Sequence, residues 1–319
     1  MVDISIIVPV FNHEHYIKKA IDSILMQKGN YSYEVLIGED CSQDNTREVL
    51  KKIVPQLPSN FYIYFRAKNM GRYGKNNIQD LYKKSTGRYL IVLEGDDFWT
   101  YEYKLQKQFE FLELHKEYLA VAHNTKIVDE YNRVIFEYYP ECKNNEYTID
   151  DFKNGLLPGQ TTTILRRNYH KYKIFDTYLE ENEYPGDRKN AFLLVANGRI
   201  ACIQEQWSAY RHVTEHGSSF SARTKIMRCE DNYRDALGFY RSIYEYSKIH
   251  MVDDAVKMVT EQLYIKCLVF YALKGVKFIS WHYVLQEIRA TRYITRDIAF
   301  IVQEVLKKIT STTYFKGKV

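Results

Sequence analysis

The stretch Tyr89-Leu90-Ile91-Val92-Leu93-Glu94-Gly95-Asp96-Asp97 decides how this chain is interpreted. Its first five residues are largely apolar and long enough for one buried strand, and three carboxylates follow within four positions. Neighbouring carboxylates repel one another, and burying them without compensation costs free energy. A divalent cation, which prefers oxygen ligands and can bring a phosphate with it, is the simplest compensation. The competing interpretation of this segment alone is an ordinary acidic turn.

Strands and helices alternate on the N-terminal side of this stretch. The pattern predicts strands at 4–8, 33–38, 61–66 and 89–93, with residues at helical spacing between them. This alternation indicates a parallel sheet with right-handed crossovers, whose ligands bind past the carboxyl ends of the strands. Polar side chains gather at those ends: Asn12, Glu39, Asp40, Asp44, Glu94, Asp96 and Asp97. We therefore expect one site there rather than scattered turns.

Two common nucleotide-binding devices are missing from the sequence. A dinucleotide-binding domain needs a glycine-rich turn after its first strand, but Pro9-Val10-Phe11-Asn12-His13-Glu14 contains no glycine. The chain also contains no GxxxxGK[ST] phosphate loop. A bound diphosphate would have to be neutralised mainly by metal, which again directs attention to the acids after the 89–93 strand.

Three ordered motifs now carry a resemblance. They are Ile6-Ile7-Val8-Pro9-Val10-Phe11-Asn12, then Glu39-Asp40-Cys41-Ser42-Gln43-Asp44-Asn45-Thr46, then Glu94-Gly95-Asp96-Asp97-Phe98-Trp99. Together with Lys104-Leu105-Gln106-Lys107-Gln108 and Phe111-Leu112-Glu113, they resemble the signatures of the family 2 glycosyltransferases over roughly residues 1–220. The resemblance implies an α/β GT-A fold, Rossmann-like, with a mostly parallel central sheet flanked by helices. It also implies a nucleotide-sugar donor.

The resemblance assigns the donor nucleotide to the strand ends. Pro9 and Phe11 match the positions that border the base, Asp40 matches the base-recognising aspartate, and Arg72 follows the Asn69-x-Gly71 turn where some relatives place an arginine. The DxD motif of the family matches Glu94-Gly95-Asp96, with Glu in the first position. Asp96 is then the expected ligand of Mn²⁺ or Mg²⁺ and Glu94 faces the ribose. Asp97 and Trp99 are further candidates.

The resemblance also implies a general base. Asp187 lies in Glu183-Tyr184-Pro185-Gly186-Asp187-Arg188, at the start of a predicted helix, where inverting relatives carry the aspartate that deprotonates the acceptor hydroxyl. Gly186 stands where many members have Glu. Plain helix capping by Asp187 is the competing interpretation. Other acids nearby are the fallback candidates: Asp176, Glu180, Glu181 and Glu183.

A later segment is similar to the loop that closes over the donor diphosphate. It contains Trp207-Ser208-Ala209-Tyr210-Arg211-His212 and His216-Gly217-Ser218-Ser219. Arg211 is either a structural residue or a phosphate partner. His216 and His212 compete as the metal-binding histidine, and a solvated loop histidine is equally compatible with the spacing. Gln160-Thr161-Thr162-Thr163 resembles the segment beside the acceptor.

Composition bounds the organisation of the chain. At 319 residues and 38.0 kDa it exceeds one average domain, so we expect a GT-A domain over 1–222 and a helical C-terminal region over 223–319. After residue 261, ten Lys and Arg residues face three Asp and Glu residues. Either this is a solvated helical surface, or it is attracted to an anionic membrane face. Nucleic acid is a weaker explanation, because no binding motif accompanies the charge.

The apolar stripe of Ile298, Ile301, Val302, Val305, Leu306 and Ile309 is expected to pack on its own domain. Lysines interrupt the apolar residues of 263–285, which argues against a membrane-spanning helix. Met1 leads straight into the first strand, and the five cysteines form no CxxC pair. These features predict a cytoplasmic protein, peripheral on the inner face of the membrane if the basic region binds lipid.

The sequence therefore predicts an inverting, metal-dependent hexosyl- or N-acetylhexosaminyltransferase. It would move a sugar from a nucleoside diphosphate, UDP in most of the family, to a saccharide or lipid-linked acceptor in surface polysaccharide biosynthesis. Two alternatives stay open. A nucleotidyltransferase has a related sheet, but its glycine-rich first loop is absent here. A weakly active or non-catalytic nucleotide-sugar-binding assembly subunit is compatible with the departures at Glu94 and Gly186.

Overall fold

The computed structural model describes residues 2–135, 139–174, 186–212, 230–274 and 279–291. The chain forms two compact units, one made of residues 1–180 and 185–227 and the other of 181–184 and 228–319. The domain boundary predicted at residue 222 lies outside the described residues. Because the two units are separate bodies, we describe each by itself.

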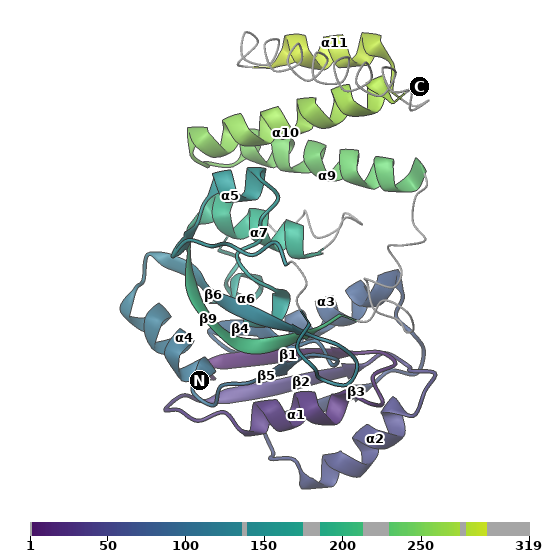
Figure 1. Ribbon diagram of the computed structural model, residues 1–319, viewed down its shortest axis with the longest axis vertical. Coiled ribbons are helices and arrows are strands. Elements are labelled where there is room, and N and C mark those ends of the chain that lie inside the picture. The colour runs from purple at the N-terminus through teal and green to yellow at the C-terminus, as the bar shows by residue number, and fades with distance from the viewer. Residues whose placement is uncertain (1, 136–138, 175–185, 213–229, 275–278, 292–319) are drawn as a thin grey trace. The chain divides into compact units, whose positions relative to one another are not determined.

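The parallel part of the sheet is built from the first hundred residues. Its strands are β1 (Ile4–Val10), β2 (Tyr33–Glu39), β3 (Phe61–Phe65) and β4 (Tyr89–Val92), in the order β3-β2-β1-β4. Between them run α1 (Ile17–Leu25), α2 (Thr46–Ile53) and α3 (Lys75–Lys84), which lie against the sheet in Figure 1. Every predicted strand and helix of this part is present.

The sheet then continues with strands of both directions. β8 (Leu165–Arg167) is antiparallel to β4 and to β6 (Tyr118–Val128), while β6 and β9 (Arg199–Arg211) run parallel. The short strands β5 (Phe98–Trp99) and β7 (Glu146–Tyr147) both pair with β9. The helices of this part are α4 (Lys104–Leu114), α5 (Ile149–Lys153), α6 (Tyr169–Tyr172) and α7 (Gly186–Asn197). The α/β fold with C-terminal helices is thereby confirmed, with an antiparallel strand inside the predicted sheet.

Burial on both faces explains why the central strands are continuous apolar runs. Ile4, Ile6, Ile7 and Val8 of β1 are all fully buried, because helices cover both sides of a parallel sheet. Helix α1 presents Ile17, Ala20, Ile21 and Ile24 to one face. Each such Ile contributes roughly 1.5–3 kcal/mol by leaving water. This core fixes the sheet on which the site is built.

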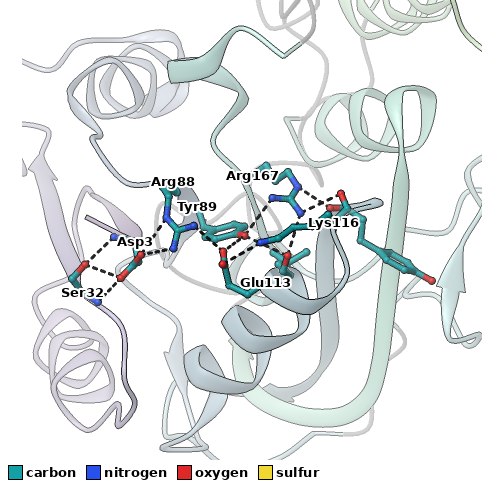
Figure 2. A network of polar contacts seen from close by, with 9 residues as sticks. Asp3, Ser32, Arg88, Tyr89, Glu113, Lys116 and Arg167 are labelled. Carbon is teal, nitrogen blue, oxygen red and sulfur yellow. Dashed lines mark hydrogen bonds and ion pairs between the residues drawn. The ribbon is translucent and has the colours of Figure 1, made fainter. Parts of the chain in front are cut away.

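A network of paired charges lies at the amino ends of the central strands (Figure 2). Asp3, just before β1, accepts 2.6 Å from Arg88 Nη2, and Arg88 Nη1 donates 2.9 Å to Glu113 of α4. Glu113 also accepts 2.6 Å from the Tyr89 hydroxyl and 3.1 Å from Lys116. Although burial acts in the opposite direction, the hydrogen bonds from Arg88 and Ser32 hold the pKa of Asp3 below its ordinary value.

The second unit contains three described helices, α9 (Glu230–Ile249), α10 (Asp254–Leu273) and α11 (Trp281–Ala290). Its core is formed mainly by α10, with Tyr264, Ile265, Leu268 and Val269 almost fully buried. None of the helices in the described ranges is long and apolar enough to cross a bilayer. The apolar stripe of 298–309 lies outside the described residues, so its expected packing stays a prediction.

Candidate active site

The loops that follow β1 and β2 are bound to each other at the carboxyl edge of the sheet. Asn12 Oδ1 accepts 2.8 Å from the Gln43 backbone, and the Asn12 backbone donates 3.0 Å to Ser42 Oγ. Asn12, Cys41 and Arg72 have positive φ values of 58°, 58° and 52°. Such conformations are unfavourable for residues other than glycine and cluster at functional sites. Here they mark the end of β1, the end of β2 and the turn after β3.

Asp40 lies at the end of β2, buried beside the turn that contains Arg72. One of its oxygens accepts 2.8 Å from the Met70 backbone, and its own carbonyl accepts 3.0 Å from Asn69 Nδ2. The other oxygen, Oδ2, is buried and has no hydrogen-bond partner within the described structure. Burial raises the pKa of Asp40, opposed by the Met70 hydrogen bond. An unpaired buried acceptor of this kind suits a ligand that brings a donor.

The acidic turn after β4 continues the β1 ladder. Leu93 N–H donates 2.8 Å to Ile7 O, and Gly95 N–H donates 3.2 Å to Pro9 O. Carboxylate oxygens of Glu94, Asp96 and Asp97 lie within 4.8 Å of one another. A Cβ at position 95 would lie 2.6 Å from His13 Nδ1, so any residue other than glycine would require the His13 ring to move. The predicted DxD segment therefore forms one compact carboxylate group.

Asp97 differs from the other two acids because both of its carboxylate oxygens accept hydrogen bonds from the protein. Oδ1 accepts 2.8 Å from the Arg211 backbone and Oδ2 accepts 2.9 Å from Gln160 Nε2. Asp97 therefore joins β9 and the 161–163 turn to the acidic turn. Asp96 and Glu94 are only partly buried. Asp96 and Glu94 are thus the two acids whose oxygens can be shared with a ligand.

The ionisation of these acids indicates one shared electrostatic environment. Burial, together with the charges of Asp96 and Asp187, raises the pKa of Glu94 to about 8. Burial and the charges of Asp96 and Glu94 likewise raise the pKa of Asp97. A divalent cation would relieve this repulsion, and carboxylate oxygens are the donors that Mg²⁺ and Mn²⁺ prefer. The donor set therefore fits the cation expected from the sequence.

Arg211 binds the backbone around this turn. Its side chain donates 2.9 Å to Asp96 O, 2.6 Å to Asp129 O and 2.8 Å to Asn132 Oδ1. These contacts favour the structural role of the two that the sequence left open. Trp99 is also buried, with Nε1 donating 3.1 Å to Thr162 O and the Lys104 ammonium 4.3 Å from its ring centroid. Arg211 thus binds the backbone of the acidic turn, and Trp99 anchors the residues that follow it.

Asp187 lies in the first turn of α7 in the described structure. Its Oδ1 accepts 2.7 Å from the backbone N–H of the next residue, Arg188, which is not the contact of an N-cap. Arg188 donates 2.9 Å to both Leu156 O and Phe152 O, which fixes the start of the helix. Burial raises the pKa of Asp187, opposed by Arg188. Asp187 is ninety-three positions from Glu94 in the sequence, and after burial and the charge of Asp96 its charge contributes to the raised pKa of Glu94.

Several predicted candidates lie elsewhere. Asp176, Glu180, Glu181, Glu183 and His216 are outside the described residues. His212 donates its backbone N–H to Val128 O at 2.9 Å, and its ring stacks on Tyr210 at 6.2 Å. In the described ranges, the group of acids that could hold an ion includes no histidine.

Sequence reasoning missed Tyr139 and His13. Burial raises the pKa of Tyr139, and the charges of Asp187, Glu94 and Asp97 raise it further. Its ring meets Tyr210 edge to face at 5.6 Å. Tyr139 has no sequence signal, because it follows β6 by eleven residues and no motif surrounds it. The usable sequence signal for His13 is its position directly after Asn12, at the end of the first strand.

The chain belongs to glycosyl transferase family 2, whose family model matches residues 5–175, more than half of the sequence. It is 28% identical over 222 residues to an uncharacterized protein of Mycobacterium tuberculosis, which covers 69% of this chain and 61% of that protein. It is also 31% identical over 109 residues to a putative teichuronic acid biosynthesis glycosyltransferase, TuaG, of Bacillus subtilis, covering 34% of this chain and 41% of that one.

Solved structures of S. aureus TarS have the same fold. The structure of its residues 1–349 with UDP superposes with a TM-score of 0.60 at 18% identity, covering 85% of this chain and 72% of that one. The corresponding complex with UDP-GlcNAc gives a TM-score of 0.60 at 17% identity, covering 91% and 79%. This chain spans 61% of the length of the first curated relatives and 43% of a longer TarS structure.

Proposed function

We propose that this protein is an inverting glycosyltransferase that uses a UDP-sugar and a divalent cation. The proposal rests above all on the carboxylate oxygens of Glu94, Asp96 and Asp97, which lie within 4.8 Å of one another after β4 in a chain of glycosyl transferase family 2. Such a reaction requires a carboxylate that deprotonates the acceptor hydroxyl. It also requires a group of carboxylates that holds a cation beside the diphosphate.

The nucleotide would lie along the ends of β1, β2 and β4. The buried, unpartnered Oδ2 of Asp40 can accept the imide N–H of uracil, a donor that cytosine lacks. Pro9 and Phe11 would border the base, Arg72 would approach it or the phosphates, and Glu94 would face the ribose. The TarS complexes with UDP and UDP-GlcNAc show that this fold accommodates such a donor in that protein.

Asp96 would hold Mn²⁺ or Mg²⁺, which supplies positive charge to the departing diphosphate. The Asp187 carboxylate takes the proton of the acceptor hydroxyl while that oxygen bonds to the anomeric carbon. The bond between this carbon and the diphosphate oxygen breaks, and UDP leaves with the electron pair. Attack from the side opposite to UDP inverts the anomeric centre.

The acceptor would be a saccharide or a lipid-linked saccharide of a surface polysaccharide, in line with the relative TuaG, a putative teichuronic acid biosynthesis glycosyltransferase. The transferred sugar is a hexose or an N-acetylhexosamine. The basic region after residue 261 would then bring the enzyme to an anionic membrane, worth roughly 1 kcal/mol per basic residue close to the surface.

Membrane attraction is tested by co-sedimentation with vesicles of phosphatidylglycerol and phosphatidylcholine. Binding should weaken with salt, because such attraction is screened within about 8 Å at physiological ionic strength. Charge reversal of Lys307, Lys308, Lys316 and Lys318, which lie outside the described residues, should reduce binding. If vesicle binding depends on neither salt nor these reversals, the basic region is a solvated or packed helical surface and not a membrane-binding one.

Release of UDP from UDP-glucose, UDP-galactose and UDP-GlcNAc with Mn²⁺ tests the central proposal. A transferase hydrolyses its donor slowly when water replaces the acceptor, whereas a binding or assembly subunit releases no UDP. Thermal shift with the same compounds identifies the donor, since a ligand that binds only the folded state raises the melting temperature. A shift without UDP release would favour the binding subunit.

A further inference from the structure

His13 lies in the loop between β1 and α1, next to the acidic turn. Its backbone N–H donates 2.7 Å to Thr46 Oγ1, and its carbonyl accepts from the Tyr16 and Ile17 backbones at 3.0 and 2.9 Å. Asn12 before it has a positive φ of 58°. The backbone of His13 is therefore held from both sides, and the strained residue before it sets its direction.

The ring of His13 points to Asp96. Nε2 is 3.8 Å from Asp96 Oδ2, and the two side chains are only 15% and 19% exposed. Nδ1 is buried and has no hydrogen-bond partner within the described structure. It packs on the glycine of the acidic turn, where a Cβ would approach it to 2.6 Å. The absence of a side chain at Gly95 thus leaves room for the imidazole against the turn.

The surroundings of the ring define its tautomer. A ring lone pair directed at a carboxylate is repelled, whereas an N–H in the same place is attracted. A proton on Nδ1 would bury an unpaired donor, which costs about 1–3 kcal/mol. The neutral ring therefore carries its proton on Nε2, toward Asp96.

Asp44 is the other acid near this ring, and it is already paired. Its Oδ1 accepts from Thr46 N–H and Oγ1 at 3.0 and 2.5 Å, and its Oδ2 accepts 3.1 Å from Glu14 N–H. Asp96 is the acid that the Nε2–H approaches. The 3.8 Å separation exceeds a hydrogen bond, so a direct Nε2–H contact requires the Asp96 carboxylate to rotate toward the ring.

We propose that His13 is the positioning residue of Asp96: its Nε2–H holds one carboxylate oxygen and directs the other to the cation. This inference rests on the proposed function. Partners that orient a metal ligand typically contribute 10- to 100-fold to metal affinity. The role differs from that of Arg211, which holds the backbone of the same turn.

The test compares His13→Leu and His13→Gln with His15→Leu as the matched control. The His15 side chain is 78% exposed and lies two residues away. Calorimetry measures UDP affinity at one pH with saturating and limiting Mn²⁺ and with EDTA. His13→Leu should weaken Mn²⁺-dependent UDP affinity about 10-fold or more. His13→Gln, whose amide can place an N–H near the same point, should retain most of it. His15→Leu should match the wild type.

UDP affinity in EDTA and the melting temperature separate positioning from packing. Both should be unchanged in His13→Gln. Wild-type Mn²⁺ dependence in His13→Leu overturns the inference, as does equal loss in the Leu and Gln variants. If His13→Leu does not fold, His13→Asn, whose amide stops short of the Nε2 position, gives the same readout. If the wild type binds UDP equally in EDTA and Mn²⁺, the proposed metal role itself is wrong, a distinct result.

Discussion

The acids at the amino ends of the central strands (the amino edge) have lowered pKa values, whereas several acids at the carboxyl ends (the carboxyl edge) have raised ones. At the amino edge, Asp3 and Glu113 are surrounded by Arg88, Lys116 and hydrogen-bonding hydroxyls, and the pKa of each acid is lowered despite burial (Figure 2). At the carboxyl edge, the pKa values of Glu94, Asp97 and Asp187 are raised. The sheet thus satisfies Asp3 and Glu113 at one edge and leaves Glu94, Asp97 and Asp187 short of positive charge at the other.

The difference shows which edge is arranged for stability and which for binding. Paired acids contribute to folding by themselves, whereas crowded, partly desolvated acids cost free energy until a ligand supplies charge or donors. Positive φ at Asn12, Cys41 and Arg72 adds strain at the carboxyl edge. Substitutions at the two edges should therefore separate activity from stability.

The largest effect is expected from Asp187→Asn. General-base assistance typically contributes 10²- to 10⁴-fold, so turnover should fall by about that factor. UDP-sugar affinity should stay native, because the base contacts the acceptor and not the nucleotide. Transfer is measured once donor binding and folding are verified, and Asp187→Glu should also be poor because its carboxylate is displaced by one methylene.

The matched control at the other edge is Glu113→Gln, which should keep its turnover. Turnover near the wild-type rate in Asp187→Asn would contradict the assignment and direct the search to Asp176, Glu180, Glu181 or Glu183.

Next in size is Asp96→Asn. Loss of one charged ligand should abolish metal-dependent UDP binding, with a decrease of at least about 10-fold. The fold should survive, since the Asp96 carboxylate makes no hydrogen bond among the described residues. Calorimetry with UDP in Mn²⁺ and in EDTA checks this. Equal wild-type affinity under both conditions would remove the metal from the mechanism.

Asp40→Ala should act on base selection. A hydrogen bond to a charged group contributes about 1.5–3 kcal/mol, so UDP affinity should fall roughly 10-fold or more while CDP affinity changes less. The ratio of the two dissociation constants is the measurement. A ratio equal to that of the wild type would mean that Asp40 does not read the base.

The smallest effect is expected at the amino edge. Asp3→Asn should lower the free energy of unfolding by about 1 kcal/mol, because the Asp3–Arg88 pair is partly exposed. The lowered pKa of Asp3 means that its contribution is present above the unfolded-state pKa and is lost as pH falls through the folded-state pKa. Urea unfolding at pH 7 and near pH 3 should show a larger difference between variant and wild type at pH 7 than near pH 3.

The contribution of Asp187 to stability should change with pH in the opposite direction to that of Asp3. Its raised folded-state pKa means that it favours folding in acid and opposes it as pH rises through that pKa. Asp187→Asn should therefore be as stable as the wild type or more stable at pH 7, while Asp3→Asn is less stable. A less stable Asp187→Asn would indicate a capping role in α7 in place of the catalytic one.

The alternation of apolar periodicities was enough to predict β1 to β4 and the helices between them. Those elements are local: each strand is an apolar run and each helix has a stripe at helical spacing. Antiparallel β8 and the parallel pairing of β6 with β9 could not be predicted, because pairing between distant strands leaves no local signal. Residues 298–309 stay a prediction, as does the domain boundary at 222.

The same division holds within the site. Chain order alone determined that Asp40 and the Glu94–Asp97 turn end parallel strands and so lie at one edge. Tertiary structure alone decided that Gln160 and Arg211 donate hydrogen bonds to Asp97. It also decided that His13 faces Asp96. Burial and the charges of Asp187 and Glu94 raise the pKa of Tyr139 only in the folded chain. The physical reason is distance along the chain. A strand end and its next residues are fixed by local geometry, whereas a hydrogen bond or a charge effect across ninety residues exists only once the chain has folded.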